Sequence, residues 1–155
     1  MLSSKNEIEQ FLACYSRCID NDDLEEWPNF FSDSAEYKII SRENFDDGFP
    51  IAVMICTGRG MFIDRVVAHR KANIFPRHRS CHILSPSRIV SDENGVTVVE
   101  TNYVVLQTRN DGETKIFNAG TYFDEIVNED GNLSFRKKHC VFDTNRVETL
   151  LVTPV

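Results

Sequence analysis

The chain has 155 residues, 41% of them hydrophobic, which is typical of a single globular domain spanning residues 1–155. Its formal net charge is −7, which argues against a nucleic-acid partner because phosphate binding depends on an excess of Lys and Arg. No stretch reaches the ~18 apolar residues of a membrane helix, and residues 1–6 lack the apolar run of a secretory signal, so we expect no membrane association.

The first third of the chain predicts two helices. Ser4 with Glu7 matches a capping box, and the apolar residues that follow have the spacing of one helical face. These residues are Ile8, Phe11, Leu12, Tyr15 and Ile19. Asp23 with Glu26 repeats the cap signal and predicts a short second helix, in which Pro28 is tolerated because it lies in the first turns. Its apolar side consists of Trp27, Phe30 and Phe31.

The next segment predicts strands at residues 35–41 and 51–56, separated by a polar loop over residues 42–50. A third helix is expected over residues 61–72, where Phe62, Ile63, Val66 and Val67 form an apolar stripe.

The second half of the chain predicts a meander of long strands. Asn94-Gly95, Asp111-Gly112 and Asp130-Gly131 are turn signals that separate four β-rich stretches. The stretches are residues 79–90, 96–108, 113–127 and 133–144, and neighbours should pair antiparallel. Long strands twist, and Pro86 and Gly120 are expected points of bending or bulging. Together these elements predict an α+β fold, with helices packed in the concavity of a strongly curved, cone-like antiparallel sheet.

The histidines and cysteines do not match a known metal-ligand pattern. Five cysteines without a Cys-x-x-Cys motif predict reduced thiols in a cytoplasmic protein. We interpret them as small buried hydrophobic residues: Cys14, Cys18, Cys56, Cys81 and Cys140. A Rieske cluster needs Cys-x-His-like pairs, whereas Cys81-His82 and His139-Cys140 are directly adjacent and would point to opposite faces of a strand. His78 and His82 would lie ~13 Å apart on a strand, so no metal site is predicted.

Catalytic patterns are equally sparse, since the chain has no G-x-S-x-G, GxGxxG or P-loop motif. We therefore predict no catalytic or cofactor-binding residue. One enzymatic alternative stays open, in which acidic and basic groups line an open cone. Its candidates are Asp20, Tyr37, Asp64, His69 and His82. The competing interpretation is that bulky aromatic residues fill the cone.

Several ordered motifs resemble the small (β) subunits of aromatic-ring-hydroxylating dioxygenases, most closely those of terephthalate dioxygenase and salicylate 5-hydroxylase. The motifs occupy residues 26–31, 37–44, 60–66, 72–75, 77–82, 143–144 and 149–155. The resemblance extends through nearly the whole chain. It implies a fold like nuclear transport factor 2 and the cystatins, and a cytoplasmic component of an oxidoreductase for aromatic hydrocarbon catabolism that is itself non-catalytic.

The resemblance also implies partners. The expected assembly is an α3β3 hetero-oligomer built on a β trimer, in which the large subunit carries the Rieske 2Fe-2S cluster and the mononuclear Fe(II). This chain would then hold no cofactor and would assemble and stabilise the large subunits. Arginine and aromatic residues are favoured in interfaces, and an apolar tail is costly to expose. The candidate interface residues are Arg77, His78, Arg79, His82, Leu150, Leu151 and Val152.

Three alternatives stay open. The tail could instead pack within its own subunit. The chain could be a free-standing dehydratase or isomerase of the same fold that uses an Asp–His pair in the cone, or a homo-oligomeric small-molecule binding module. An open polar cone with such a pair would favour the enzyme, and an open apolar cone the binding module.

Overall fold

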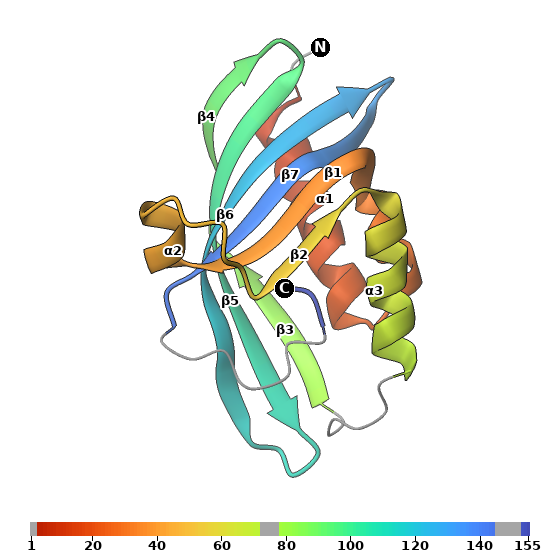
Figure 1. Ribbon diagram of the computed structural model, residues 1–155, viewed down its shortest axis with the longest axis vertical. Helices are drawn as coiled ribbons and strands as arrows, with labels where there is room; N and C mark the ends of the chain where they lie inside the picture. Colours follow the sequence, from red (N-terminus) through yellow and green to blue (C-terminus); the bar gives the residue numbers. More distant parts are fainter. Residues whose placement is uncertain (1–2, 72–77, 145–152) are drawn as a thin grey trace.

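The computed structural model describes residues 3–71, 78–144 and 153–155, and it has the predicted α+β fold. A curved seven-stranded sheet is covered on its concave face by α1 (Lys5–Asp20), the 3₁₀ helix η1 (Leu24–Phe30) and α3 (Arg59–Lys71) (Figure 1). None of the described helices is long and apolar enough to cross a membrane.

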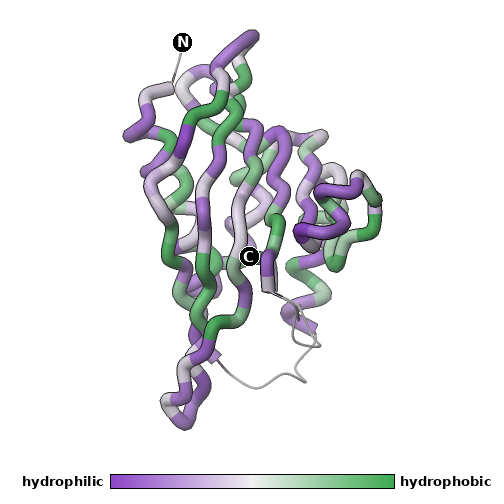
Figure 2. The backbone as a smooth tube through the Cα atoms, turned by 90° about the vertical axis from the view of Figure 1, so that its left-hand side faces the viewer, coloured by the Kyte–Doolittle hydropathy of each residue, from purple (hydrophilic) through white to green (hydrophobic). Residues whose placement is uncertain are grey.

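Seven strands form the sheet. They are β1 (Phe31–Ser41), β2 (Met54–Thr57), β3 (His78–Leu84), β4 (Arg88–Glu93), β5 (Val96–Arg109), β6 (Thr114–Glu129) and β7 (Asn132–Phe142). Their order is β2-β1-β7-β6-β5-β3, and β4 pairs with the first part of β5. The predicted antiparallel pairs β4–β5, β5–β6 and β6–β7 are confirmed. Figure 2 shows polar and apolar residues alternating along the strands, as expected for a sheet with one buried face.

Two sheet predictions were wrong. The sheet is mixed rather than purely antiparallel, because β1 pairs parallel with β7. Turn signals determine only the pairing of consecutive strands, whereas β1 and β7 are joined through most of the chain. The expected strand 79–90 is divided into β3 and β4, because Pro86 lies at the break and has no N–H to donate.

The helix predictions were partly confirmed. Ser4 and Glu7 form the predicted capping box. Asp23 was wrongly predicted as a cap, since its side chain makes no capping hydrogen bond and the following segment, with Pro28 inside it, is a 3₁₀ helix. In α3, Phe62 and Val66 are buried but Ile63 and Val67 are exposed, because only a narrow side of the helix faces the sheet and η1.

A further helix was missed. The expected loop 42–50 contains α2 (Arg42–Asp46), whose N-cap Ser41 accepts a hydrogen bond from the Asn44 backbone N–H at 3.2 Å. Phe45 of this helix stacks on Phe123 at 4.8 Å between ring centroids. Because the neighbouring Tyr122 points into the core, α2 covers the outer face of the sheet rather than its concavity.

The core fills the cone with aromatic side chains. The largest fully buried ones include Tyr15, Trp27, Tyr37, Phe62, Tyr103, Tyr122 and Phe135. Rings from α1, η1, α3 and the sheet meet one another, for example Phe31 and Phe62 at 4.3 Å between centroids. All five cysteines are free, and Cys18, Cys56 and Cys140 are buried as predicted; Cys14 and Cys81 are exposed instead, since each points away from the core. The cone is therefore a packed core.

Candidate functional site

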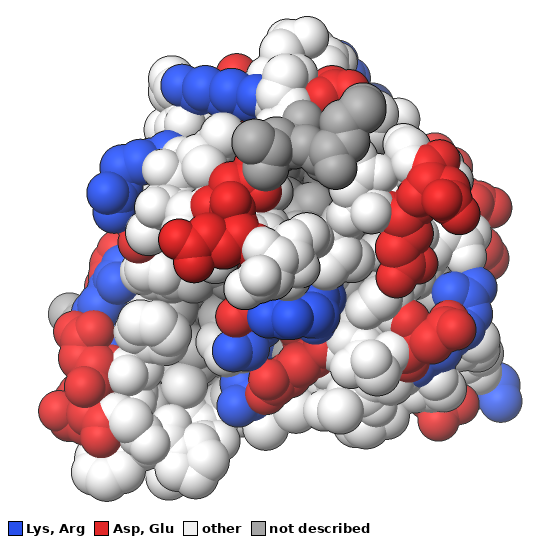
Figure 3. Space-filling model, turned by 90° about the horizontal axis from the view of Figure 1, so that it is seen from above, with Lys and Arg blue, Asp and Glu red and all other residues white. Residues whose placement is uncertain are grey.

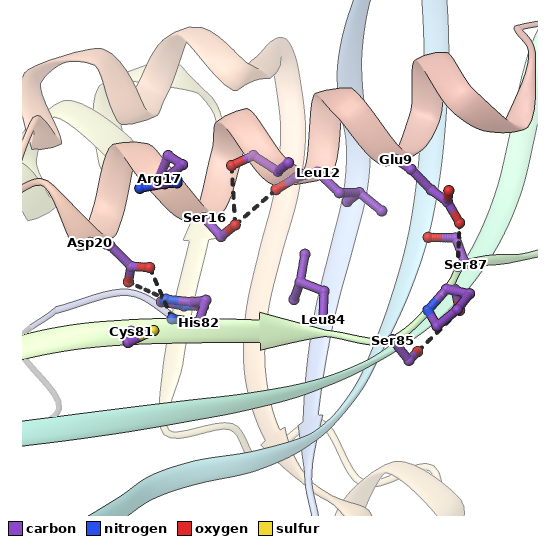
Figure 4. A pocket seen from close by; sticks show the side chains of 12 residues that line it. Glu9, Leu12, Ser16, Arg17, Asp20, Cys81, His82, Leu84, Ser85 and Ser87 are labelled. Carbon is purple, nitrogen blue, oxygen red and sulfur yellow. Dashed lines mark hydrogen bonds and ion pairs between the residues drawn. The ribbon is translucent and has the colours of Figure 1, made fainter. Parts of the chain in front are cut away.

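A groove lies between α1 and β3 and has a volume of about 590 Å³ (Figure 4). Its polar lining comes from four residues of α1 and from β3 with the linker that follows it. These residues are Glu9, Ser16, Arg17 and Asp20, and Cys81, His82, Ser85 and Ser87. The Glu9 carboxylate accepts a hydrogen bond from the Ser87 backbone N–H at 2.9 Å. This bond connects the linker between β3 and β4 to α1.

The side chains of Asp20 and His82 contact each other at one end of this groove (Figure 4). Oδ1 of Asp20 lies 2.6 Å from Nδ1 of the ring, and Oδ2 accepts a hydrogen bond from the His82 backbone N–H at 2.9 Å. Nε2 is buried and has no hydrogen-bond partner among the described residues. A carboxylate that orients an imidazole could serve acid–base chemistry. Here, however, a substrate in the groove could not reach Nε2 unless the ring were uncovered.

The five residues of the enzymatic alternative do not come together. Tyr37 lies in the filled cone, where its hydroxyl contacts Val155. Asp64 is exposed on α3. His69 contacts the Thr153 hydroxyl through Nε2 at 3.0 Å, and burial lowers the pKa of its ring. Asp20 and His82 are in direct contact between α1 and β3, and Asp20 and His69 line one groove.

A buried ion pair inside the cone was missed by the sequence analysis. The Lys138 ammonium donates to both carboxylate oxygens of Asp124 at 3.2 Å, and both side chains are fully buried. Lys138 also lies 3.4 Å from the centroid of the Tyr122 ring. Burial raises the pKa of Asp124 to about 6, although Lys138 acts to lower it. The alternation along β6 could have revealed this pair, since it places Asp124 on the inward face between Tyr122 and Ile126.

The predicted interface residues are described only in part. His78 and Arg79 begin β3, the edge strand of the sheet, and Arg79 is exposed. They line a second groove, of about 470 Å³, together with residues of α1, α3 and the tail. The His82 ring faces α1 instead of the outer surface. Arg77, Leu150, Leu151 and Val152 lie outside the described residues.

Metal-ligand chemistry does not converge in the described part of the chain. Residues 3–71, 78–144 and 153–155 contain no group of three or more His, Cys, Asp or Glu that could hold a metal ion. In the adjacent pairs the two side chains diverge: Cys81 is exposed while the His82 side chain is fully buried. Likewise Cys140 points into the core, whereas His139 lies beside Glu36 at 3.7 Å.

The chain is similar to several known proteins over almost its entire length. The SnoaL-like domain family matches residues 1–139. The chain is 42% identical to the anthranilate 1,2-dioxygenase small subunit of Burkholderia cepacia over 96% of this chain and 92% of that protein. It is 34% identical to the β2 subunit of the terephthalate 1,2-dioxygenase terminal oxygenase component of a Comamonas species, over 96% and 97%.

A solved structure extends the similarity to three dimensions. It is a protein from Novosphingobium aromaticivorans assigned as the β subunit of an aromatic-ring-hydroxylating dioxygenase. The two chains are 45% identical and superpose with a TM-score of 0.90, covering 97% of this chain and 96% of that one.

Proposed function

We infer that this chain, which belongs to the SnoaL-like domain family and within it to the small subunits of aromatic-ring-hydroxylating dioxygenases, is the structural β subunit of such an oxygenase. It assembles with and stabilises a large (α) subunit that performs the hydroxylation. The observation that carries this function is the 42% identity to a dioxygenase small subunit over 96% of the chain.

The dehydratase or isomerase alternative is disfavoured by the interior of the cone. Fully buried aromatic side chains occupy the space that a substrate would need. An Asp–His pair exists, but it connects α1 to β3 at the side of the molecule, and its second ring nitrogen is buried. The pair is therefore explained by a structural role.

We propose that the iron centres of the complex, a Rieske 2Fe-2S cluster and a mononuclear Fe(II), reside in the large subunit. Support comes from the donor geometry of this chain, since the described His and Cys side chains that are adjacent in sequence diverge in space. When bound in the large subunit, these groups would supply electron transfer and oxygen activation. This chain would contribute surfaces that hold the large subunits in position.

We also propose that three copies of this chain form the base of an α3β3 assembly in the cytoplasm. The free cysteines fit a reducing compartment. The surface offers apolar contact area, because four alternate side chains before and within edge strand β2 are exposed: Phe49, Ile51, Val53 and Ile55. Figure 3 shows acidic and basic groups interspersed on one face, as expected for a surface that does not bind nucleic acid.

Co-expression tests this function. The chain is co-produced with its proposed large subunit, and the mass of the complex is measured by native mass spectrometry. We expect equal numbers of the two chains and a mass of three pairs. Arg79→Glu should reduce recovery of the large subunit by about tenfold, whereas the control Lys5→Glu, at the start of α1, should not. Failure of the large subunit to co-purify with the parent chain would overturn the function.

A further inference from the structure

The last three residues return into the cone. Val155 is only 1% exposed, Pro154 is buried, and Thr153 is held by His69 of α3 through the 3.0 Å contact between its hydroxyl and Nε2. The main-chain oxygen of Val155 accepts hydrogen bonds from the hydroxyls of Tyr15 at 2.8 Å and Tyr37 at 2.9 Å. This segment therefore occupies the core in the manner of a bound ligand.

Polar side chains surround the backbone of Val155. Its backbone N–H donates to the Tyr37 hydroxyl at 3.0 Å, so one phenol contacts both the donor and the acceptor of the same residue. The thiol of Cys140 points at the same oxygen from 3.5 Å. Burial raises the pKa of both tyrosines well above the ordinary value, so both hydroxyls stay protonated and able to donate.

The two tyrosine hydroxyls share this oxygen as their acceptor. The Tyr15 hydroxyl also lies near two other polar groups, the Nε1–H of Trp27 at 3.4 Å, which is a donor, and the Tyr37 hydroxyl. The Tyr37 hydroxyl donates to the Val155 oxygen and accepts from the Val155 N–H, and it also lies near the Tyr15 hydroxyl and the Cys140 thiol. Removing a hydrogen-bond acceptor from buried hydroxyls is costly, so the Val155 oxygen, which both phenols share, stabilises this arrangement.

We propose that the cone contains a small-ligand site whose resident ligand is the chain's own Val155. The site fits an acyl compound with a carbonyl or carboxylate oxygen for the two phenols, an adjacent N–H for Tyr37 and a small branched apolar group. An N-acylated branched-chain amino acid has this chemistry. Occupied from within, the site is closed to diffusible molecules.

The only tryptophan of the chain provides a local probe. Trp27 is fully buried, contacts Tyr15, and lies 5.3 Å from Tyr37 between ring centroids, so its emission reports on the occupancy of the site. The chain is compared with a version lacking residues 153–155, with N-acetyl-Thr-Pro-Val as the ligand added in trans. The peptide N-acetyl-Thr-Pro-Asp is the control, because it places a charge where the valine side chain lies.

The deletion should lower the melting temperature by about 5–10 °C and change the Trp27 emission. Millimolar N-acetyl-Thr-Pro-Val should recover at least about 2 °C of that loss and restore the emission, because a ligand that binds only the folded state stabilises it. The control peptide should do neither. Adding Tyr37→Phe to the deletion should abolish the recovery, since it removes the hydroxyl that contacts both the N–H and the oxygen.

Two results would overturn the proposal. One is a deletion variant whose melting temperature and Trp27 emission match those of the full chain. The other is a folded deletion variant on which both peptides have the same effect. If the deletion variant does not fold alone, the yield of refolding is measured with each peptide; a severalfold higher yield with N-acetyl-Thr-Pro-Val supports the site, and equal yields overturn it. These measurements use the chain alone, so they are independent of its assembly with a large subunit.

Discussion

Lys138 and Asp124 face each other on paired positions of β7 and β6, and both side chains are fully buried. The ammonium lies 3.2 Å from each carboxylate oxygen and is surrounded by the rings of Tyr15, Tyr122 and Phe135. Removing a charge from water costs several kcal/mol per ion, which the partner charge offsets only while both are present. The two residues therefore have to be considered as a unit.

Breaking this pair should destabilise the chain strongly. We expect Lys138→Met to lower the free energy of unfolding by about 3–5 kcal/mol at neutral pH, because it leaves Asp124 buried without a counter-charge. Urea denaturation measures the loss. Lys38→Met is the matched control, since it removes a partly exposed pair with Glu36 and should cost no more than about 1 kcal/mol. Similar losses in the two variants would contradict the prediction.

The same pair predicts an unusual pH dependence. Burial raises the pKa of Asp124 from 3.8 to about 6 in the folded chain, so the folded state holds this proton more tightly than the unfolded state. The stability contributed by Asp124 is therefore fully present below about pH 4 and is lost as the pH rises through about 6. We expect the difference in unfolding free energy between the parent and Asp124→Asn to fall by about 2 kcal/mol from pH 4 to 7. Urea denaturation at each pH measures this difference, and a rising or constant difference would refute the assignment.

Gly120 should tolerate no side chain. A Cβ at this position would lie 1.9 Å from the backbone oxygen of Val141, because β6 and β7 approach closely there. We expect Gly120→Ala to cost more than about 4 kcal/mol or to prevent recovery of soluble chain. Gly60→Ala is the control: its Cβ would meet nothing within 4 Å in α3, and it should stabilise the helix by about 0.5–1 kcal/mol. Thermal melting measures both effects: Gly120→Ala should melt well below the parent chain, and Gly60→Ala slightly above it.

Local signals and long-range contacts differed in how well they could be predicted. Asn94-Gly95 lies at a tight turn with positive φ at both residues, and from such turns the order of the last four strands followed. The parallel pairing of β1 with β7 and the contact of Val155 with Tyr37 join residues about a hundred positions apart, and no turn or periodicity encodes such contacts. Asp20 and His82 were named among the candidates of the enzymatic alternative, but no sequence signal predicted their contact, which only the fold shows.

The Asp20–His82 pair should act as a structural connection between α1 and β3. Asp20→Asn can accept only one of the two hydrogen bonds that the carboxylate accepts, so we expect a loss of about 1–3 kcal/mol in urea denaturation. Asp64→Asn, an exposed change on α3, should stay within about 0.5 kcal/mol. In the assembled oxygenase, Asp20→Asn should leave hydroxylation per folded complex unchanged. A tenfold loss of that rate with intact stoichiometry and melting temperature would instead assign the pair a chemical role, because a structural connection acts only through folding.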